Sequence, residues 1–213
     1  MAFRGWPAEA LEFYEGLEAD NTKAYWTANK PVYDEQVHAP MVELLADLEK
    51  EFGAGKIFRP YRDVRFSKDK TPYKTNIGAT VEHGGYIQLS ASGLGAGSGM
   101  YRMAPDQLTR FREAVDEEIK GTELERLIAT AARAKIDITG YDKLKSAPKG
   151  YSRDHPRIEL LRWKGLIAWK EWPVAAWLGT AAAKKRLVEF FHATDPLNAW
   201  LANHVGDSEL PDY

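Results

Sequence analysis

The chain has 213 residues, of which 44% are hydrophobic and 28% charged, and its formal net charge is −2. A chain of this length buries roughly 70% of its unfolded surface, so it needs neither disulfides nor a structural metal to fold. The absence of cysteine excludes disulfides, thiolate nucleophiles and zinc–thiolate sites. Because the chain as a whole is not basic, only a local patch could bind nucleic acid through charge.

No apolar run reaches the roughly 18–20 residues that a membrane span requires. Residues Met1–Pro7 lead directly into a charged amphipathic segment and lack the apolar core of a signal peptide. We therefore expect a cytoplasmic protein with no membrane partner. The length also favours a single domain over residues 1–213.

The first quarter of the chain, residues 7–53, is predicted to be helical. Pro7 suits the first turn of a helix, and apolar residues then recur at helical spacing. Asp20-Asn21 is predicted to end this helix and to cap the next one. Pro31 is expected to kink or end the second helix, and Gly53 to stop a third.

Sheet-forming sequence follows in residues 57–103 and 135–170. Alternating patterns predict strands over 57–66, 77–82, 86–91, 135–139 and 166–169. His83-Gly84-Gly85 has the composition of a hairpin turn between two of them. These patterns predict an α+β fold, in which N-terminal and C-terminal helices flank a central, mostly antiparallel sheet.

Further helices are predicted in the second half of the chain. One begins at Pro105, and Thr122 with Glu125 forms a plausible capping box for the next. Pro156 is predicted to open a short helix. The C-terminal helices, residues 181–205, are predicted as two, with the second opened by Pro196.

The basic stretch, residues 59–75, concentrates positive charge. Its local charge is +4, while the net charge of the whole chain is −2. Such a local concentration of positive charge indicates either a binding site for an anion or ion pairs with acidic residues of the same chain. Aromatic residues alternate with the cations. The stretch contains six cations (Arg59, Arg62, Arg65, Lys68, Lys70, Lys74), two anions (Asp63, Asp69) and three aromatics (Tyr61, Phe66, Tyr73).

A strand over Arg62–Ser67 would place Asp63, Arg65 and Ser67 on one face. The following residues would form a loop that presents hydroxyls, backbone amides and two ammonium groups. Arginine forks and lysine charges together suit a small phosphorylated or carboxylated ligand. The predicted ligand-binding residues are Arg62, Arg65, Ser67, Lys68, Lys70, Tyr73 and Lys74, with Lys149 from a second segment, and Asp63 and His155 are candidate proton-transfer groups.

Two alternatives stay open for the basic stretch. In the first, Asp63 and Asp69 pair with neighbouring cations, the stretch is structural, and function resides on a protein–protein surface. In the second, Tyr61, Phe66 and Tyr73 stack on nucleic-acid bases while the cations meet phosphates. The acidic remainder of the chain counts against nucleic acid.

The second segment, Pro148–Pro156, contains His155, whose ordinary pKa of about 6.5 suits general acid–base chemistry. Asp154 is its sequence neighbour, but adjacent side chains of an extended chain point in opposite directions, which disfavours a dyad. The structural alternative is that Asp154 caps the helix opened by Pro156. Lys149 and Arg153 would add to the anion site if the fold brought the two segments together.

Other signatures of chemistry are weak. The glycine run Gly93–Gly99 has the spacing G-x-G-x-G-x-G, and the next helix begins only near Pro105, so a nucleotide-binding loop is disfavoured. A strand or bulge where another backbone or a ligand approaches closely is the better prediction. The five histidines lack metal-ligand spacing. No metal or cofactor is expected, and the sequence assigns no enzymatic activity.

The segment Arg62–Thr75 resembles the signature of a bacterial and fungal family catalogued as domain of unknown function 2461. The resemblance extends over nearly the whole chain, although Pro31 departs from the helix-compatible residue expected there. It implies no established activity. Further matching residues are Asn21, Trp26, Tyr33, Gly95, Gly97, Gly99, Tyr101, Pro105, Pro148-Lys-Gly-Tyr151 and Asp154-His-Pro156.

Overall fold

The computed structural model describes residues 2–65 and 67–210. The chain divides into two compact units. Unit 1 comprises the chain up to Ala96 together with Glu171–Glu189, and unit 2 comprises Gly97–Lys170 together with the chain from Phe190 onward. The expectation of a single domain over residues 1–213 stays a prediction.

Six strands form an antiparallel sheet, which with the helices confirms the predicted α+β class. The strand order is β1-β2-β3-β4-β6-β5. The strands are β1 Gly55–Ile57, β2 Asn76–Val81, β3 Gly85–Ser90, β4 Gly93–Met100, β5 Asp137–Thr139 and β6 Leu166–Pro173. The predicted hairpin is confirmed, because Val81 pairs with Gly85 across a tight turn.

Unit 1 begins with helices, as predicted. They are α1 Ala8–Ala19, α2 Lys23–Val32, the π-helical segment η1 Tyr33–His38 and α3 Ala39–Phe52. The helix end expected as one of two outcomes at Pro31 is wrong, because the helical path continues from α2 through η1 into α3. The other expected outcome, a kink, stays a prediction. The π-helical segment follows Pro31 almost directly and shifts the hydrogen-bond register there. Thr22, not Asp20-Asn21, caps α2 by accepting the Tyr25 N–H at 3.2 Å.

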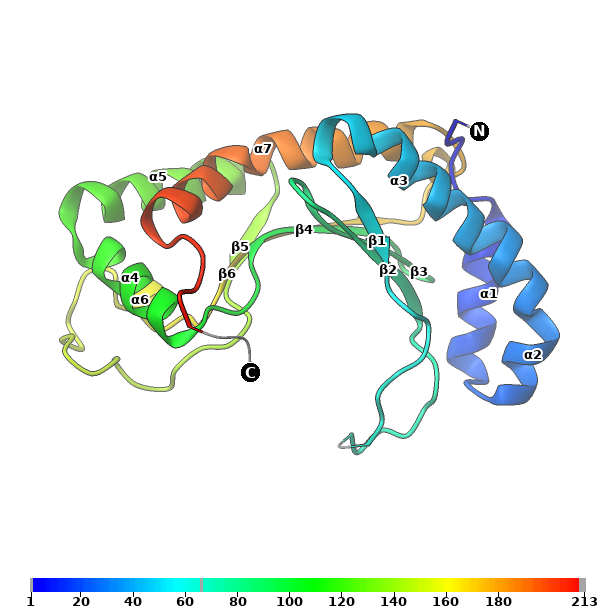
Figure 1. Cartoon of the computed structure of the whole chain (residues 1–213), viewed down its shortest axis with the longest axis horizontal. Coiled ribbons are helices and arrows are strands. Elements are labelled where there is room, and N and C mark those ends of the chain that lie inside the picture. The colour runs from blue at the N-terminus through cyan, green and yellow to red at the C-terminus, as the bar shows by residue number, and fades with distance from the viewer. Residues whose placement is uncertain (1, 66, 211–213) are drawn as a thin grey trace. The chain divides into compact units, whose positions relative to one another are not determined.

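The sheet of unit 1 has one buried and one polar face. Helix α3 packs against β1 and β2 (Figure 1). Along β2 and β3, alternate residues are buried and carry apolar side chains: Ile77, Ala79, Val81, Ile87 and Leu89. The intervening positions are mostly half-buried and polar: Asn76, Thr80, Tyr86, Gln88 and Ser90. This alternation fixes the register, because a slip by one residue would expose the apolar set.

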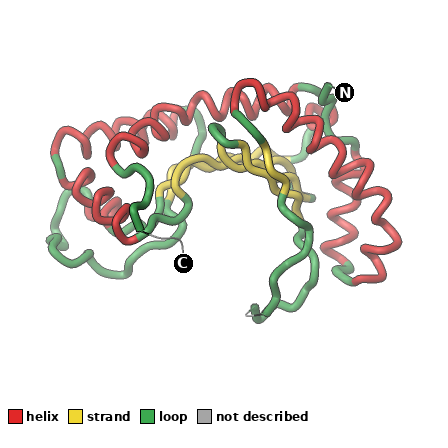
Figure 2. Tube along the Cα trace, viewed as in Figure 1, coloured by secondary structure: helices red, strands yellow, loops and turns green. Residues whose placement is uncertain are grey.

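The predicted strand over 57–66 is wrong beyond Ile57. Residues 58–65 and 67–75, here called the arm, lie between β1 and β2 and form a loop (Figures 1 and 2). The arm pairs with itself through a bridge between Tyr61 and Tyr73 and does not extend the strand. Phe66 lies outside the described residues. The alternating pattern therefore reflects a folded-back loop, and the described residues of the predicted Arg62–Ser67 strand, 62–65 and 67, form no strand.

Unit 2 contains α4 Pro105–Asp116, α5 Glu118–Arg133 and the short α6 Ile158–Leu161. Helix α4 packs on α5 and α6, and α5 packs on β5. The predicted capping box of Thr122 with Glu125 is wrong, because α5 begins at Glu118, four residues before Thr122. Its cap is Glu117, which accepts the N–H groups of Ile119 and Lys120.

The short helix after Pro156 starts later than expected, at Ile158. Arg157 is the residue that precedes α6, so Asp154 is not its cap.

The last helix, α7 Ala182–His204, is continuous through Pro196, so the predicted pair of C-terminal helices is wrong. An interior proline costs a helix roughly 3 kcal/mol. Buried apolar residues on both sides of Pro196 offset that cost; they include Leu187, Phe191, Leu197 and Trp200. Within the described part of the chain, no helix combines the length and apolar character needed to cross a bilayer.

Candidate functional site

The arm is anchored to the helices of unit 1 through Tyr73. Its ring is only 5% exposed and stacks on Trp26, with ring centroids 4.4 Å apart and planes 7° from parallel. The Asn21 carboxamide satisfies both backbone groups of Tyr73: its oxygen accepts the N–H at 3.0 Å and its nitrogen donates to the carbonyl at 3.1 Å. Tyr73, predicted to bind ligand, therefore has little surface to offer one.

The base of the arm separates two bridged tyrosines from basic side chains. Arg62 N–H donates to the Pro72 carbonyl at 2.9 Å, and Lys74 N–H donates to the Pro60 carbonyl at 2.8 Å. These bonds flank the Tyr61–Tyr73 bridge, so alternation directs the two tyrosines to one face and Arg62 and Lys74 to the other. The basic face includes Phe58, whose ring centroid lies 5.6 Å from Lys74 Nζ.

Both carboxylates of the arm pair with arginines of the arm. Asp69 binds Arg62, which also contacts the Thr71 hydroxyl. Asp63 binds Arg65, with 2.7 Å between Oδ2 and Nη2. For these two arginines the structural alternative fits the geometry.

Hydrogen bonds from the side chain and backbone N–H of Arg65 lower the pKa of Asp63. A carboxyl group with a lowered pKa accepts protons poorly at neutral pH, which weighs against a proton-transfer role for Asp63.

The other four cations have no carboxylate partner among the described residues. Lys70 Nζ donates to the Val64 carbonyl at 2.9 Å, while Arg59 and Lys68 are exposed. Lys74 is half-buried, and its pKa is lowered by desolvation and by the nearby charge of Arg59. A partly desolvated ammonium beside a second cation is a local excess of positive charge that a bound anion would relieve.

Ser67, another predicted ligand-binding residue, lies at the tip of the arm. It is half-buried, and its N–H donates to the Val64 carbonyl at 3.4 Å.

The Asp69 carboxylate gives the tip of the arm a testable pH dependence. Bonds from Thr71 N–H, Arg62 and the Thr71 hydroxyl lower its pKa from 3.8 to about 2. Because the folded pKa is depressed, its contribution is complete above pH 3.8 and is lost as the pH falls through about 2. We expect carbon-13 NMR of the Asp69 carboxyl to titrate near 2, and Arg62→Gln to raise that midpoint. A wild-type midpoint at the ordinary value would contradict this geometry.

In unit 2, the predicted acid–base residue His155 has both ring nitrogens engaged. Nδ1 accepts the Arg157 N–H at 3.0 Å, and Nε2 lies 3.0 Å from Asp116 Oδ1. Since Nδ1 is an acceptor, Nε2 carries the proton and donates to Asp116 in the neutral ring. The partner is thus Asp116, 39 residues away, and not Asp154. Neither nitrogen is left to take a proton from a substrate.

The neighbouring Arg157 is a structural residue. Its side chain is 5% exposed and binds Glu118 and Glu125, each at 3.0 Å, and the Thr122 hydroxyl at 2.8 Å. These bonds tie the second segment to α5. Lys149 is exposed in unit 2, whereas the arm belongs to unit 1. A joint site of Lys149 with the arm stays a prediction.

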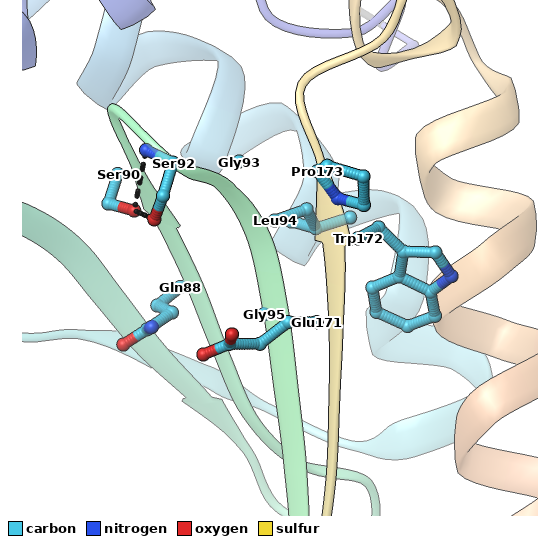
Figure 3. Close-up of a pocket in the computed structure, with 9 residues that line it drawn as sticks. All are labelled: Gln88, Ser90, Ser92, Gly93, Leu94, Gly95, Glu171, Trp172 and Pro173. Atoms are coloured by element: carbon cyan, nitrogen blue, oxygen red, sulfur yellow. Dashed lines mark hydrogen bonds between the residues drawn. The ribbon is translucent and has the colours of Figure 1, made fainter. Parts of the chain in front are cut away.

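A groove with both polar and apolar side chains in its lining lies on the sheet of unit 1 (Figure 3). Its volume is about 170 Å³, and its lining includes Gln88, Ser90, Ser92 and Glu171. The Ser90 and Ser92 hydroxyls are 2.8 Å apart, as drawn in Figure 3. Gln88 Oε1 accepts from Asn76 at 2.8 Å. Sequence reasoning missed this groove, because its residues come from strands whose pairing the sequence does not specify.

No group of three or more His, Asp or Glu residues suited to a metal ion occurs in the described ranges 2–65 and 67–210. No curated protein and no solved structure matches the chain. A family model described as "Conserved hypothetical protein (DUF2461)" matches residues 9–200. Because this match covers most of the sequence, the chain belongs to the DUF2461 family.

Proposed function

We propose that the chain binds a small phosphorylated or carboxylated molecule at the basic face of the arm. Lys74 and Arg59 hold the anion, and Lys68 and Lys70 add positive charge. The main observation behind this proposal is that Lys74 is half-buried and near Arg59 and has no carboxylate partner among the described residues. Arg62 and Arg65, paired with Asp69 and Asp63, shape the tip of the arm.

The groove on the sheet of unit 1 is evidence that the ligand is a small molecule. The Phe58 ring lies 6.2 Å from the Tyr86 ring, and the Tyr86 hydroxyl donates to Gln88 at 3.3 Å. Gln88 also lines the groove, so a cation–ring contact, a ring–ring contact and one hydrogen bond connect Lys74 in sequence with the groove. A groove of about 170 Å³ suits part of a small molecule and not a polymer.

The nucleic-acid alternative receives less support. Of its three stacking residues, Tyr73 is already stacked on Trp26 and Phe66 lies outside the described residues. Tyr61 is 49% exposed and is the one stacking surface that can be placed. Single-strand binding typically uses several aromatic platforms in succession.

The test is calorimetric titration with inorganic phosphate and, separately, succinate. We expect saturable binding of at least one of them, weakened roughly tenfold or more in Arg59→Gln/Lys74→Gln, because two charge-assisted contacts are lost. Lys23→Gln/Lys50→Gln is the matched control: both lysines are exposed helix residues of unit 1 outside the arm, and the loss of charge is equal. Equal weakening by the two double variants, or none by the first, would reject the proposal.

A further inference from the structure

Unit 2 has a cavity of its own beside the second segment. Its volume is about 400 Å³, within the roughly 300–1,000 Å³ typical of small-molecule pockets. The loop after β5 contributes Lys145, Ser146 and Arg153, and α6 with the residue that follows it contributes Ile158, Glu159 and Arg162. Three cations thus face one carboxylate and one hydroxyl.

The wall formed by Arg162 is held in place by the loop. Leu144 N–H donates to the Arg162 carbonyl at 2.8 Å, and Arg162 Nε donates back to the Leu144 carbonyl at 2.7 Å. Arg162 Nη2 donates to the Lys145 carbonyl at 3.0 Å and Nη1 to Glu159 at 2.9 Å. Three of the five guanidinium N–H groups are used in this way. Within the described part of the chain, the remaining two guanidinium N–H groups of Arg162 are free to bind a ligand, and the three existing bonds already fix their position.

The carboxylate in the cavity is neutralised by its neighbours. Glu159 pairs with both Lys143 and Arg162, and these contacts lower its pKa, so it stays ionised and engaged. Lys145 and Arg153 are exposed and form no ion pair with any described residue. The cavity lining therefore carries three positive charges, and Glu159 supplies the single negative charge among the lining residues.

We infer that this cavity is a second anion site, which binds the phosphate group of a small phosphate monoester. Arg162 and Arg153 offer planar forks, Lys145 a mobile ammonium, and Ser146 a hydroxyl, which together match a dianionic group with three oxygens. Ile158 and Ala147 supply an apolar wall for the carbon portion of the ligand. The inference does not depend on the arm, because every residue involved belongs to unit 2.

The test is calorimetric titration of the full chain with methyl phosphate, in a background carrying Arg59→Gln and Lys74→Gln so that the arm does not contribute. We expect one saturable site in this background. Adding Lys145→Gln and Arg153→Gln is expected to weaken it roughly tenfold or more. Adding Arg126→Gln and Arg133→Gln, which remove equal charge from exposed positions of α5, is expected to leave it unchanged.

Absence of saturable binding in the Arg59→Gln/Lys74→Gln background overturns the inference. So does unchanged affinity after Lys145→Gln and Arg153→Gln, or an equal loss in the α5 control. Amide NMR shifts of Ser146 and Ala147 on titration locate the site independently of the variants. Failure of this test leaves the arm untouched, because the arm is tested with its own variants. Repeating the arm titration in a chain that carries Lys145→Gln and Arg153→Gln removes any contribution of the unit 2 cavity.

Discussion

Gly93→Ala is expected to destabilise the chain by about 4 kcal/mol or more, which is an exceptional cost for one methyl group. Gly93 has φ +124°, a backbone conformation that an L side chain rarely adopts. A Cβ there would lie 2.2 Å from the Trp172 carbonyl oxygen, so β4 and β6 would have to move apart. The predicted close approach of another backbone to the glycine run is thus confirmed. Urea unfolding followed by circular dichroism measures the effect.

Substitutions at two other glycines distinguish the cost of backbone strain from the cost of steric overlap. Gly150 has φ +94° and nothing within 4 Å of an added Cβ, so Gly150→Ala measures backbone strain alone, about 1–3 kcal/mol. Gly179 lacks the positive φ, and its Cβ would meet its nearest neighbour at 3.5 Å, so Gly179→Ala is expected to be nearly neutral. If Gly93→Ala costs no more than Gly150→Ala, the close packing of β4 on β6 is wrong.

Local periodicity predicted the class of the fold and most of its elements. The helical first quarter, the hairpin at His83–Gly85 and the strands beyond it follow from patterns within a few residues. The predicted break at Pro196, and the helix end that was one of two outcomes expected at Pro31, are wrong because an interior proline costs a helix only a few kcal/mol, which tertiary packing can offset. The capping-box pattern at Thr122 failed because α5 already begins at Glu118; Thr122 lies inside the helix and binds Arg157, 35 residues away.

The sequence located the candidate site but not the roles within it. Composition alone marked the basic stretch, yet it could not distinguish Arg62, which pairs with Asp69, from Lys74, which has no carboxylate partner among the described residues. The anchor of the arm was missed because Asn21 and Tyr73 are 52 residues apart. Asn21 resembles a helix cap in sequence, and only the folded chain brings its carboxamide to a backbone that needs both a donor and an acceptor.

Trp26→Ala is expected to destabilise unit 1 by about 3–5 kcal/mol, the usual cost of truncating a buried tryptophan. Trp26 is 5% exposed, stacks on Tyr73 and contacts the rings of Phe13 and Tyr33. Its loss removes the surface on which the arm rests. We therefore expect a second effect, faster hydrogen exchange of the Lys74 amide, whose bond to the Pro60 carbonyl closes the base of the arm.

Asn21→Ala distinguishes anchoring of the arm from general loss of stability. It removes both side-chain bonds to the Tyr73 backbone but leaves no large cavity, so the expected cost is only about 1–3 kcal/mol. Exchange at Lys74 should nevertheless accelerate as it does in Trp26→Ala, because the same anchor is lost. Trp200→Ala removes a buried tryptophan of unit 2 and is expected to leave that exchange slow in the folded chain. If exchange at Lys74 instead follows global stability across all three variants, Asn21 and Trp26 do not hold the arm, and its basic face is not preorganised for a ligand.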